Sequence, residues 1–456
     1  MLQKKHKIHF IGIGGIGMSG IAEVLLNSGY MVSGSDLQEN EATRRLCSLG
    51  ARVFVGHQEE NLAGHPSVVV ISTAVKYSNP EVLEARRRHI PVIPRAEMLA
   101  ELMRMKYGVA VAGSHGKTTT TSMIAAVLST AGLDPTMVIG GRVHMFGANA
   151  KNGQGEMLVA EADESDGSFL LLSPIIAVVT NIDKEHMDFH QTMERLDESF
   201  LAFINKIPFY GLAVLCIDDP RVRGLVTKVR KRFTTYGLSA EAEFSAKDLN
   251  SRAAGVEYTV THHGKTSGKL RLHLPGRHSA TNALAAVAVA HELEIPFEQI
   301  AAALNAFTGI HRRFEVKGEP GGIMVIDDYG HHPTEIRATL GAIRDSWKRP
   351  LTVVFQPHRF TRTRDLFDEF LTAFEGADRL VLTEIYAAGE DPIAGASGEA
   401  LYRAIKRKGH LDVKFVPDKN DIVAQLAGKL TVGDVVLTLG AGDIYKVGEA
   451  LVEALK

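Results

Sequence analysis

The apolar residues of this 456-residue chain gather in short runs that alternate with longer amphipathic segments. The first run covers residues 7–13, and a helix-like segment follows at about 18–27. Further runs of strand length cover 30–35, 67–72 and 90–93. Buried strands that alternate with amphipathic helices are typical of parallel sheets with crossover helices. The first hundred residues therefore predict an α/β domain.

The same alternation restarts twice further along the chain. After a polar helix at 96–105, which we interpret as a linker, a second series contains strands at 107–112, 157–161 and 175–181 and helices at 117–131 and 281–293. Within this series, polar and apolar residues alternate strictly on both sides of His263-Gly264-Lys265, which predicts an added antiparallel hairpin. A third series of strands is predicted at 323–326, 351–355, 379–383, 413–416 and 435–438.

These three series predict an α/β protein of three domains, each a mainly parallel sheet with flanking helices. The expected bounds are 1–104, 105–313 and 314–456. The first and third domains are expected to be Rossmann-like. The central domain is expected to resemble a P-loop ATPase with a β-hairpin addition.

Composition narrows the class of protein. The formal net charge of −2 creates no field that would attract nucleic acid or an anionic membrane, and no segment has the length and apolarity of a membrane span or the pattern of a signal peptide. The two cysteines, Cys47 and Cys216, form no disulfide framework, and we interpret both as unreactive core thiols. We predict a cytoplasmic protein with no nucleic-acid partner and no membrane insertion; its oligomeric state, monomer or dimer, stays open.

A first glycine-rich loop follows the first predicted strand and reads Gly12-Ile13-Gly14-Gly15-Ile16-Gly17. The glycines Gly12, Gly14, Gly15 and Gly17 allow a tight turn in which backbone N–H groups approach a pyrophosphate at a helix N-terminus. Asp36 ends the next strand, where an acid meets a ribose hydroxyl in such folds. A dinucleotide cofactor and a UDP-linked ligand both satisfy this pattern, and a tight turn without a ligand is the third alternative.

A second loop follows the strand that begins the central series. It comprises Gly113, Ser114, His115, Gly116, Lys117, Thr118 and Thr119. In a P-loop, backbone amides surround phosphate, the lysine reaches the terminal phosphates and the threonine hydroxyl binds magnesium. The eight-residue Walker pattern needs a glycine where this chain has Val111, so the loop is more compact. We interpret it as a phosphate site.

Acidic and histidine residues follow the next two strands of the central series. Glu161 ends its strand and is the best candidate for a magnesium ligand, whereas Glu164 and Asp166 fit an acidic surface loop. His186 and His190 have the i,i+4 spacing of a zinc pair, yet no third soft ligand is evident. We therefore favour His186 as a ligand or orienting group at a magnesium site.

In the third series, polar loops follow two strands. The first loop is Asp327-Asp328-Tyr329-Gly330-His331-His332-Pro333, and the second is Gln356-Pro357-His358-Arg359-Phe360-Thr361-Arg362. Arg359 and Arg362 have the chemistry to clamp a carboxylate or phosphate through bidentate bonds. A packed histidine pair and an exposed basic loop are the alternatives without a ligand.

Taken together, these motifs resemble those of the Mur ligase family over the whole chain. The resemblance rests on residues 113–121, 161–166, 180–183 with 186–188, Gly276-Arg277-His278 with Asn282, 312–314, 327–335 and 356–359. It implies a UDP-binding domain, a central ATPase domain and a C-terminal domain that closes over the site. One departure is Ser279, where the family usually has Asn.

The resemblance also implies roles for individual residues. Lys117 would contact the ATP phosphates, Thr118 and Glu161 would hold one Mg²⁺, and His186 a second. The substrate-binding set would be Gly12, Gly14, Gly15, Gly17, Asp36 and Ser72 for UDP, and Tyr329, His331, His358, Arg359 and Arg362 for the amino acid and sugar acid. Asn282 would contact adenine, Arg313 the phosphates and Asp328 the nucleotide ribose. Lys117, Glu161, His186, Arg313 and His331 form the implied catalytic set.

The implied activity is ATP-dependent ligation of L-alanine to the carboxylate of UDP-N-acetylmuramate through an acyl phosphate, in peptidoglycan precursor synthesis. The cofactors would be ATP and Mg²⁺, and the base is His331 or a water molecule. A family member that recycles muramyl peptides is the nearest alternative. A nicotinamide-dependent dehydrogenase and a non-catalytic nucleotide-binding regulator are alternatives from other classes.

Overall fold

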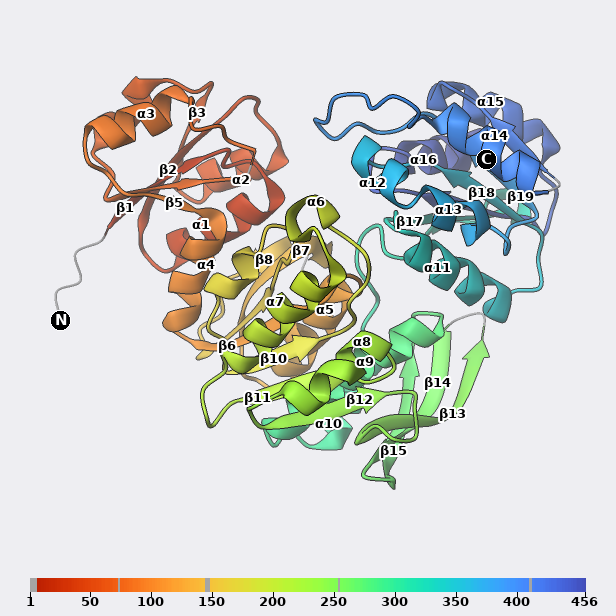
Figure 1. Ribbon diagram of the computed structural model, residues 1–456, viewed down its shortest axis with the longest axis horizontal. Coiled ribbons are helices and arrows are strands. Elements are labelled where there is room, and N and C mark those ends of the chain that lie inside the picture. Colours follow the sequence, from red (N-terminus) through yellow and green to blue (C-terminus); the bar gives the residue numbers. More distant parts are fainter. Residues whose placement is uncertain (1–5, 73, 144–147, 253–254, 410–411) are drawn as a thin grey trace. The chain divides into compact units, whose positions relative to one another are not determined.

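The computed structural model describes residues 6–72, 74–143, 148–252, 255–409 and 412–456. It contains two compact units (Figure 1): the first comprises 1–247, 259–268 and 281–304, and the second comprises 248–258, 269–280 and 305–456. The described residues form three sheets, of five, ten and six strands. The predicted architecture of three mainly parallel α/β sheets is therefore confirmed, whereas the exact domain bounds stay a prediction.

The first sheet has the strand order β3-β2-β1-β4-β5 and is parallel throughout. Its strands are β1 (Lys7–Ile11), β2 (Met31–Asp36), β3 (Arg52–Val55), β4 (Val68–Ile71) and β5 (Val92–Pro94), and the helices are α1 (Ile16–Asn27), α2 (Glu41–Ser48), α3 (Pro80–Arg87) and α4 (Arg95–Arg104). Alternate residues of β1 serve the two faces: Phe10 belongs to the core that includes α1, and Ile11 to the core that includes α3. The strand ends before Gly12, which has a φ of +79°.

The second sheet has the order β15-β14-β13-β12-β11-β10-β6-β9-β7-β8. Its strands are β6 (Tyr107–Ala112), β7 (Thr136–Val143), β8 (Ala148–Lys151), β9 (Met157–Glu161), β10 (Ile176–Val179), β11 (Leu212–Cys216), β12 (Phe233–Gly237), β13 (Phe244–Arg252), β14 (Gly255–His262) and β15 (Lys265–Leu272). Its helices are α5 (Lys117–Thr130), α6 (Met187–His190), α7 (Met193–Asn205), α8 (Pro220–Leu225), α9 (Arg277–Glu292) and α10 (Phe297–Asn305). The predicted hairpin corresponds to β14 and β15.

Three neighbouring strands of this sheet end at one edge. Strand β6 pairs in parallel with both β10 and β9, with Ala112 opposite Val179 and Val111 opposite Glu161. Because parallel strands end on the same side, the second glycine-rich loop, the acidic segment after β9 and the segment after β10 all begin at that edge. The sheet order therefore brings together the polar segments singled out in the sequence.

The third sheet has the order β16-β17-β21-β18-β19-β20. It comprises β16 (Glu315–Gly318), antiparallel to its neighbour, and the parallel strands β17 (Met324–Asp328), β18 (Leu351–Phe355), β19 (Arg379–Leu382), β20 (Val413–Phe415) and β21 (Val435–Leu439). Helices α11 (Pro333–Ser346), α13 (Phe367–Ala373) and α14 (Gly398–Lys408) contribute to one core, α15 (Ile422–Leu426) and α16 (Tyr445–Ala454) to another, and α12 (Phe360–Asp365) follows β18. Strand β17 contributes to both cores. Ile326 belongs to the core with α11, α13 and α14, and Val325 belongs to the core with α15 and α16.

The two cysteines differ in environment. Cys216 is buried, and burial raises the pKa of its thiol to about 12. Cys47 is exposed on α2, so its interpretation as a core thiol was wrong. The buried face of that short helix is formed by Thr43 and Leu46 instead. Among the described helices, none combines the length and apolarity needed to cross a membrane.

Candidate functional site

The first glycine-rich loop borders a pocket of about 530 Å³. Gly12, Gly14, Gly15, Asp36 and Ser72 all line it, as do residues of the segments after β3 and β4. A Cβ atom at Gly12 would lie 3.1 Å from the Ser72 hydroxyl, so the loop and the end of β4 are in close approach. The pocket thus gathers most of the residues predicted to bind UDP.

Two residues of that predicted set have other partners. The Asp36 carboxylate accepts a hydrogen bond from the Gly14 amide at 2.8 Å, so this acid orders the loop as well as lining the pocket. Gly17 lies against the side chain of Arg95, which a Cβ atom at Gly17 would approach to 3.2 Å. Ligand contacts of both residues stay a prediction.

The second loop connects β6 to α5 through two glycines with positive φ. Gly113 has a φ of +137°, and a Cβ atom there would lie 2.0 Å from the Thr180 hydroxyl oxygen. Gly116 has a φ of +79°, and its Cβ would lie 2.8 Å from the amide oxygen of Asn282. Only glycine fits such positions without displacement of its neighbours. The predicted nucleotide residue Asn282 is therefore a direct neighbour of the loop.

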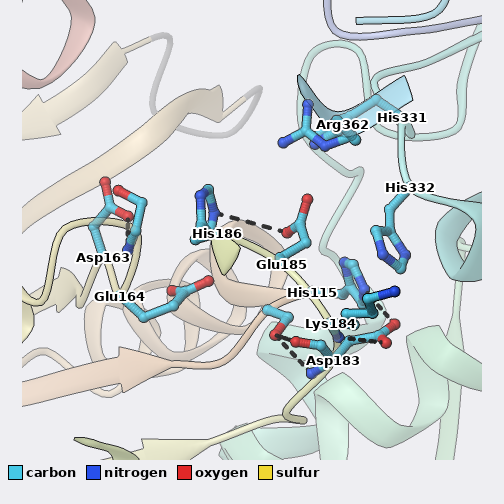
Figure 2. A network of polar contacts seen from close by, with 12 residues as sticks. His115, Asp163, Glu164, Asp183, Lys184, Glu185, His186, His331, His332 and Arg362 are labelled. Atoms are coloured by element: carbon cyan, nitrogen blue, oxygen red, sulfur yellow. Dashed lines mark hydrogen bonds and ion pairs between the residues drawn. The ribbon is translucent and has the colours of Figure 1, made fainter. Parts of the chain in front are cut away.

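Residues after β10 hold the backbone of this loop. The His115 amide donates to the Asn181 side chain at 2.8 Å, and the Thr180 hydroxyl donates to the His115 carbonyl at 2.6 Å. The Asp183 amide donates to the Ser114 hydroxyl at 2.8 Å, and the Asp183 carboxylate lies 3.0 Å from His115 Nε2 (Figure 2). The loop is thereby preorganised by the neighbouring strand.

Lys117 begins α5 and forms a buried ion pair. Its ammonium lies 2.9 and 3.0 Å from the two carboxylate oxygens of Glu164 and donates to the Gly113 and Ser114 carbonyls. Burial opposes the charge of Lys117, but the attraction of Glu164 and Asp163 raises its pKa above the ordinary value. Burial raises the pKa of Glu164 to about 7, against the opposing effect of Lys117. The lysine therefore carries its charge at the phosphate loop.

The interpretation of Glu164 as a surface acid was wrong. Its exposed fraction is 1%, because the segment after β9 turns back towards α5, where His190 Nε2 donates to the Glu164 carbonyl at 2.8 Å. Asp166, by contrast, is only partly buried and caps the next turn by accepting from the Ser168 amide. The sequence of acids alone does not separate these two environments.

Three side chains at this edge of the sheet have the arrangement of a cation site. One ligand atom each from Glu164, Glu185 and His186 lie within 4.8 Å of one another (Figure 2). Two carboxylates and an imidazole are donors that fit a divalent cation. His186 is thus grouped with two acids, whereas His190 Nε2 donates to the Glu164 carbonyl.

The other predicted magnesium residues lie at the same edge. Thr118 is buried in the first turn of α5, next to Thr119. Glu161 ends β9 and accepts from the Gly140 amide at 2.6 Å. Within the described residues, the three-ligand group that includes His186 does not contain Glu161. Coordination by Thr118 and Glu161 stays a prediction.

In the second unit, the loop after β17 gathers aromatic and cationic groups. The Arg313 guanidinium lies 4.9 Å from the centre of the Tyr329 ring and 3.7 Å from the Glu335 carboxylate. The His331 ring meets Tyr329 edge-on, and its Nδ1 lies 3.1 Å from the Tyr329 carbonyl. Asp328 accepts from the Phe314 and Gly330 amides, and burial raises its pKa to about 6. A nucleotide contact by Asp328 stays a prediction.

The loop after β18 adds more cationic groups to this surface. His358 stacks on Tyr386, lies 5.8 Å from His331 between ring centres and contacts the Arg362 guanidinium at 3.2 Å. Arg359 has a φ of +71°, and its Nε is buried without a hydrogen-bond partner among the described residues. Five predicted residues therefore meet in one cationic cluster: Tyr329, His331, His358, Arg359 and Arg362. Such a cluster fits a carboxylate.

This cluster predicts a pH dependence of stability. Burial, together with the charges of His331, Arg362 and Arg359, lowers the pKa of His358 to about 3. Because the unfolded chain binds the proton near pH 6.5 and the folded chain does not, stability falls as pH drops below about 6.5. We expect His358→Asn to reduce the loss between pH 7 and 5 by about 1–2 kcal/mol, a figure discounted for partial exposure. Urea unfolding at both pH values, with exposed His273→Asn as control, measures it; an equal loss in both variants would contradict it.

Several site residues were not predicted. Three residues that hold or surround the phosphate loop are Glu164, Glu185 and Asn181. In the sequence, only their position after strands β9 and β10 indicated a role at the site. Ser279, where the family usually has an amide side chain, donates to the Pro275 carbonyl at 2.8 Å. Its hydroxyl therefore forms a local hydrogen bond at the start of α9.

Three family models match successive parts of the chain. They are described as the Mur ligase family catalytic domain, the Mur ligase middle domain and the Mur ligase glutamate ligase domain, and they match residues 7–107, 111–290 and 312–442. The matches cover the three segments that hold the two loops and the cationic cluster.

Relatives match over nearly the whole chain. The UDP-N-acetylmuramate–L-alanine ligases of Syntrophotalea carbinolica and Geotalea uraniireducens are 59% and 58% identical, with 100% of this chain and 99% of each relative covered. The crystal structure of the UDP-N-acetylmuramate–alanine ligase of Thermotoga maritima is 31% identical, with a TM-score of 0.83 and 98% of both chains covered. Because the three family models match successive segments and full-length relatives are up to 59% identical, this chain belongs to the Mur ligase family.

Proposed function

We propose that the chain joins L-alanine to the carboxylate of UDP-N-acetylmuramate while ATP is converted to ADP and phosphate, in peptidoglycan precursor synthesis. The observation that carries this proposal is the buried Lys117–Glu164 pair at the phosphate loop, beside the group of Glu164, Glu185 and His186. It occurs in a chain that matches ligases of this name from end to end.

The chemistry explains why the site is built around charge. A carboxylate reacts poorly with an amine because its leaving group would be oxide. Attack of a carboxylate oxygen on the γ-phosphorus of ATP expels ADP and forms an acyl phosphate. The amine of L-alanine then attacks the carbonyl carbon, loses a proton and expels phosphate. Both steps need positioned positive charge more than covalent help from the protein.

Residues of the first unit would bind the nucleotide. The loop amides and the Lys117 ammonium would contact the phosphates. Thr118 and Glu161 would hold one magnesium ion, and His186, grouped with Glu164 and Glu185, would hold a second. Bound magnesium would supply charge neutralisation of the phosphate oxygens. Both carboxylate oxygens of Glu164 contact the ammonium of Lys117. The γ-phosphate would therefore compete with Glu164 for this lysine.

Residues of the second unit would bind the alanine and sugar-acid carboxylates. Arg359 and Arg362 offer guanidinium groups, and Tyr329 and His331 offer an aromatic wall. Arg313, next to Tyr329, would contact the nucleotide phosphates. His358 stays neutral near pH 7 because its pKa is lowered to about 3, so a ring nitrogen can accept a hydrogen bond there. We propose His331 or a water molecule as the base for the attacking amine.

Phosphate release tests the proposed activity. With ATP and Mg²⁺ present, we expect release only when both UDP-N-acetylmuramate and L-alanine are added, together with a product heavier by one alanine residue. Release with a free tripeptide that begins with L-alanine, in place of L-alanine itself, would assign the chain to peptide recycling. No release with either acceptor would contradict a ligase function.

A further inference from the structure

A buried carboxylate lies behind the pocket of the first glycine-rich loop. Glu81, in α3, has no exposed surface, yet its carboxylate has four hydrogen-bond partners and its Oε1 also lies 3.6 Å from His57 Nδ1. Its Oε1 accepts from the Asn61 side chain at 2.7 Å and from the Gln58 amide at 3.2 Å. Its Oε2 lies 2.9 Å from His9 Nε2 and 2.8 Å from the Ser35 hydroxyl. No step of the proposed reaction uses this residue.

The charge of Glu81 fixes the direction of these hydrogen bonds. Burial raises its pKa, but hydrogen bonds from His9 and Asn61 outweigh this and keep the pKa below the ordinary value. An ionised carboxylate only accepts hydrogen bonds. The single hydroxyl proton of Ser35 therefore points to Glu81, which leaves the Ser35 oxygen as an acceptor.

The Ser35 oxygen in turn sets the tautomer of His57. His57 Nδ1 lies 2.9 Å from this oxygen. Because the Ser35 proton is already donated to Glu81, Nδ1 must carry the hydrogen of this bond. In the neutral ring, Nε2 is then an acceptor. Nε2 forms no hydrogen bond with any residue that the structure describes.

His57 is placed where this acceptor can meet a ligand. It follows β3, lines the pocket of the first glycine-rich loop and has a side chain that is 15% exposed. Glu81 holds the segment on both sides, through the Gln58 amide and through Asn61, which also donates to the Gly56 carbonyl. The ring is thus fixed by backbone and side chain together.

We infer that Glu81 and Ser35 position His57 as a hydrogen-bond acceptor for the uridine part of the substrate. The inference rests on the proposed function, which places a uridine nucleotide in this pocket. Phosphate oxygens only accept hydrogen bonds, so they are poor partners for Nε2 and match the loop amides instead. Uridine offers donors: the imide N–H of the base and the ribose hydroxyls.

Calorimetric titration of the full chain with UDP tests the inference. His57→Asn keeps a donor near Ser35 but has no atom at the Nε2 position, whereas His57→Gln keeps a polar group there. We expect His57→Asn to weaken UDP binding about 5- to 20-fold, the value of one lost hydrogen bond. We expect Ser35→Ala to weaken UDP binding less than His57→Asn does. The UDP affinity of His57→Gln should stay within about 3-fold of wild type. ATP affinity, measured on the same proteins, should not change.

Ser33→Ala is the matched control. Ser33 lies on the same strand and contacts His9 Nδ1 at 2.9 Å, so its loss disturbs the buried network without reaching His57. UDP affinity should therefore be unchanged in Ser33→Ala. An equal loss of affinity in Ser33→Ala and Ser35→Ala would reduce the network to a structural role and overturn the inference.

Analogues identify the donor of the nucleotide. N3-methyl-UDP lacks the imide hydrogen, and 2′-deoxy-UDP and 3′-deoxy-UDP each lack one hydroxyl. For one of the three analogues, the wild-type affinity should be lower than the wild-type affinity for UDP. The His57→Asn variant should bind that analogue and UDP with equal affinity. If every analogue loses affinity by the same factor in wild type and in His57→Asn, the inference is overturned. The same holds if His57→Asn binds UDP with wild-type affinity, and in both cases the proposed function stands. If wild type binds no UDP, the proposed function fails with it.

Discussion

Lys117→Met will lower kcat for ligation on the order of 10³-fold while the affinity for UDP-N-acetylmuramate stays within about 2-fold. The ammonium is the cation held at the phosphate loop, and removal of one preorganised group that stabilises transferred charge costs about 10²–10³ in rate. The UDP pocket is formed by the other glycine-rich loop, so it should be unaffected. Steady-state phosphate release and calorimetric titration measure the two quantities.

Lys151→Met is the matched control for this variant. Lys151 also forms an ion pair, with Asp134 at 2.7 Å, but its side chain is 43% exposed and lies away from the phosphate loop at the end of β8. We expect its kcat to stay within about 2-fold of wild type. A Lys117→Met enzyme with nearly normal kcat would contradict the role of this lysine.

At pH 8, where Glu164 with its pKa of about 7 is mostly ionised, Glu164→Gln will lower the free energy of unfolding by about 3–5 kcal/mol in the absence of nucleotide. Loss of one partner from a buried ion pair leaves an uncompensated charge, here the ammonium of Lys117. Mg²⁺ and ATP should reduce this difference, because phosphate oxygens then replace the missing carboxylate. Denaturant unfolding followed by circular dichroism measures it. The fluorescence of Trp347, the sole tryptophan and part of the second unit, gives an internal comparison.

Asp166→Asn controls for the charge of the same segment. Asp166 is less buried than Glu164, and Asn keeps the oxygen that accepts from the Ser168 amide. We expect a change below about 0.5 kcal/mol. Equal stability of Glu164→Gln and Asp166→Asn, with or without nucleotide, would show that the Lys117–Glu164 pair does not carry the expected energy.

The parts of the site that the sequence predicted are local in character. Both glycine-rich loops follow buried strands and precede helices, and the pattern of apolar residues identifies such strands from a few neighbours. The loops after β17 and β18 were found in the same way. The polar residues after β6, β9 and β10 lie at one edge because these parallel strands end on one side of the sheet.

The parts that were missed depend on partners far away in the chain. Glu164 resembles its acidic neighbours in sequence, and its burial follows from Lys117, 47 residues before it. The partners of Glu81 include His9, 72 residues away, and Ser35, 46 residues away. No short pattern carries such pairings, since they are set by how strands and helices pack.

The fate of the substrate oxygen tests the acyl-phosphate reaction most directly. UDP-N-acetylmuramate labelled with ¹⁸O in its carboxylate would be incubated with ATP, Mg²⁺ and L-alanine, and the released phosphate analysed by mass spectrometry. If the carboxylate attacks the γ-phosphorus and phosphate leaves from the carbonyl carbon, each phosphate carries one atom of ¹⁸O from the substrate. Unlabelled phosphate accompanied by full amide product would contradict an acyl-phosphate intermediate.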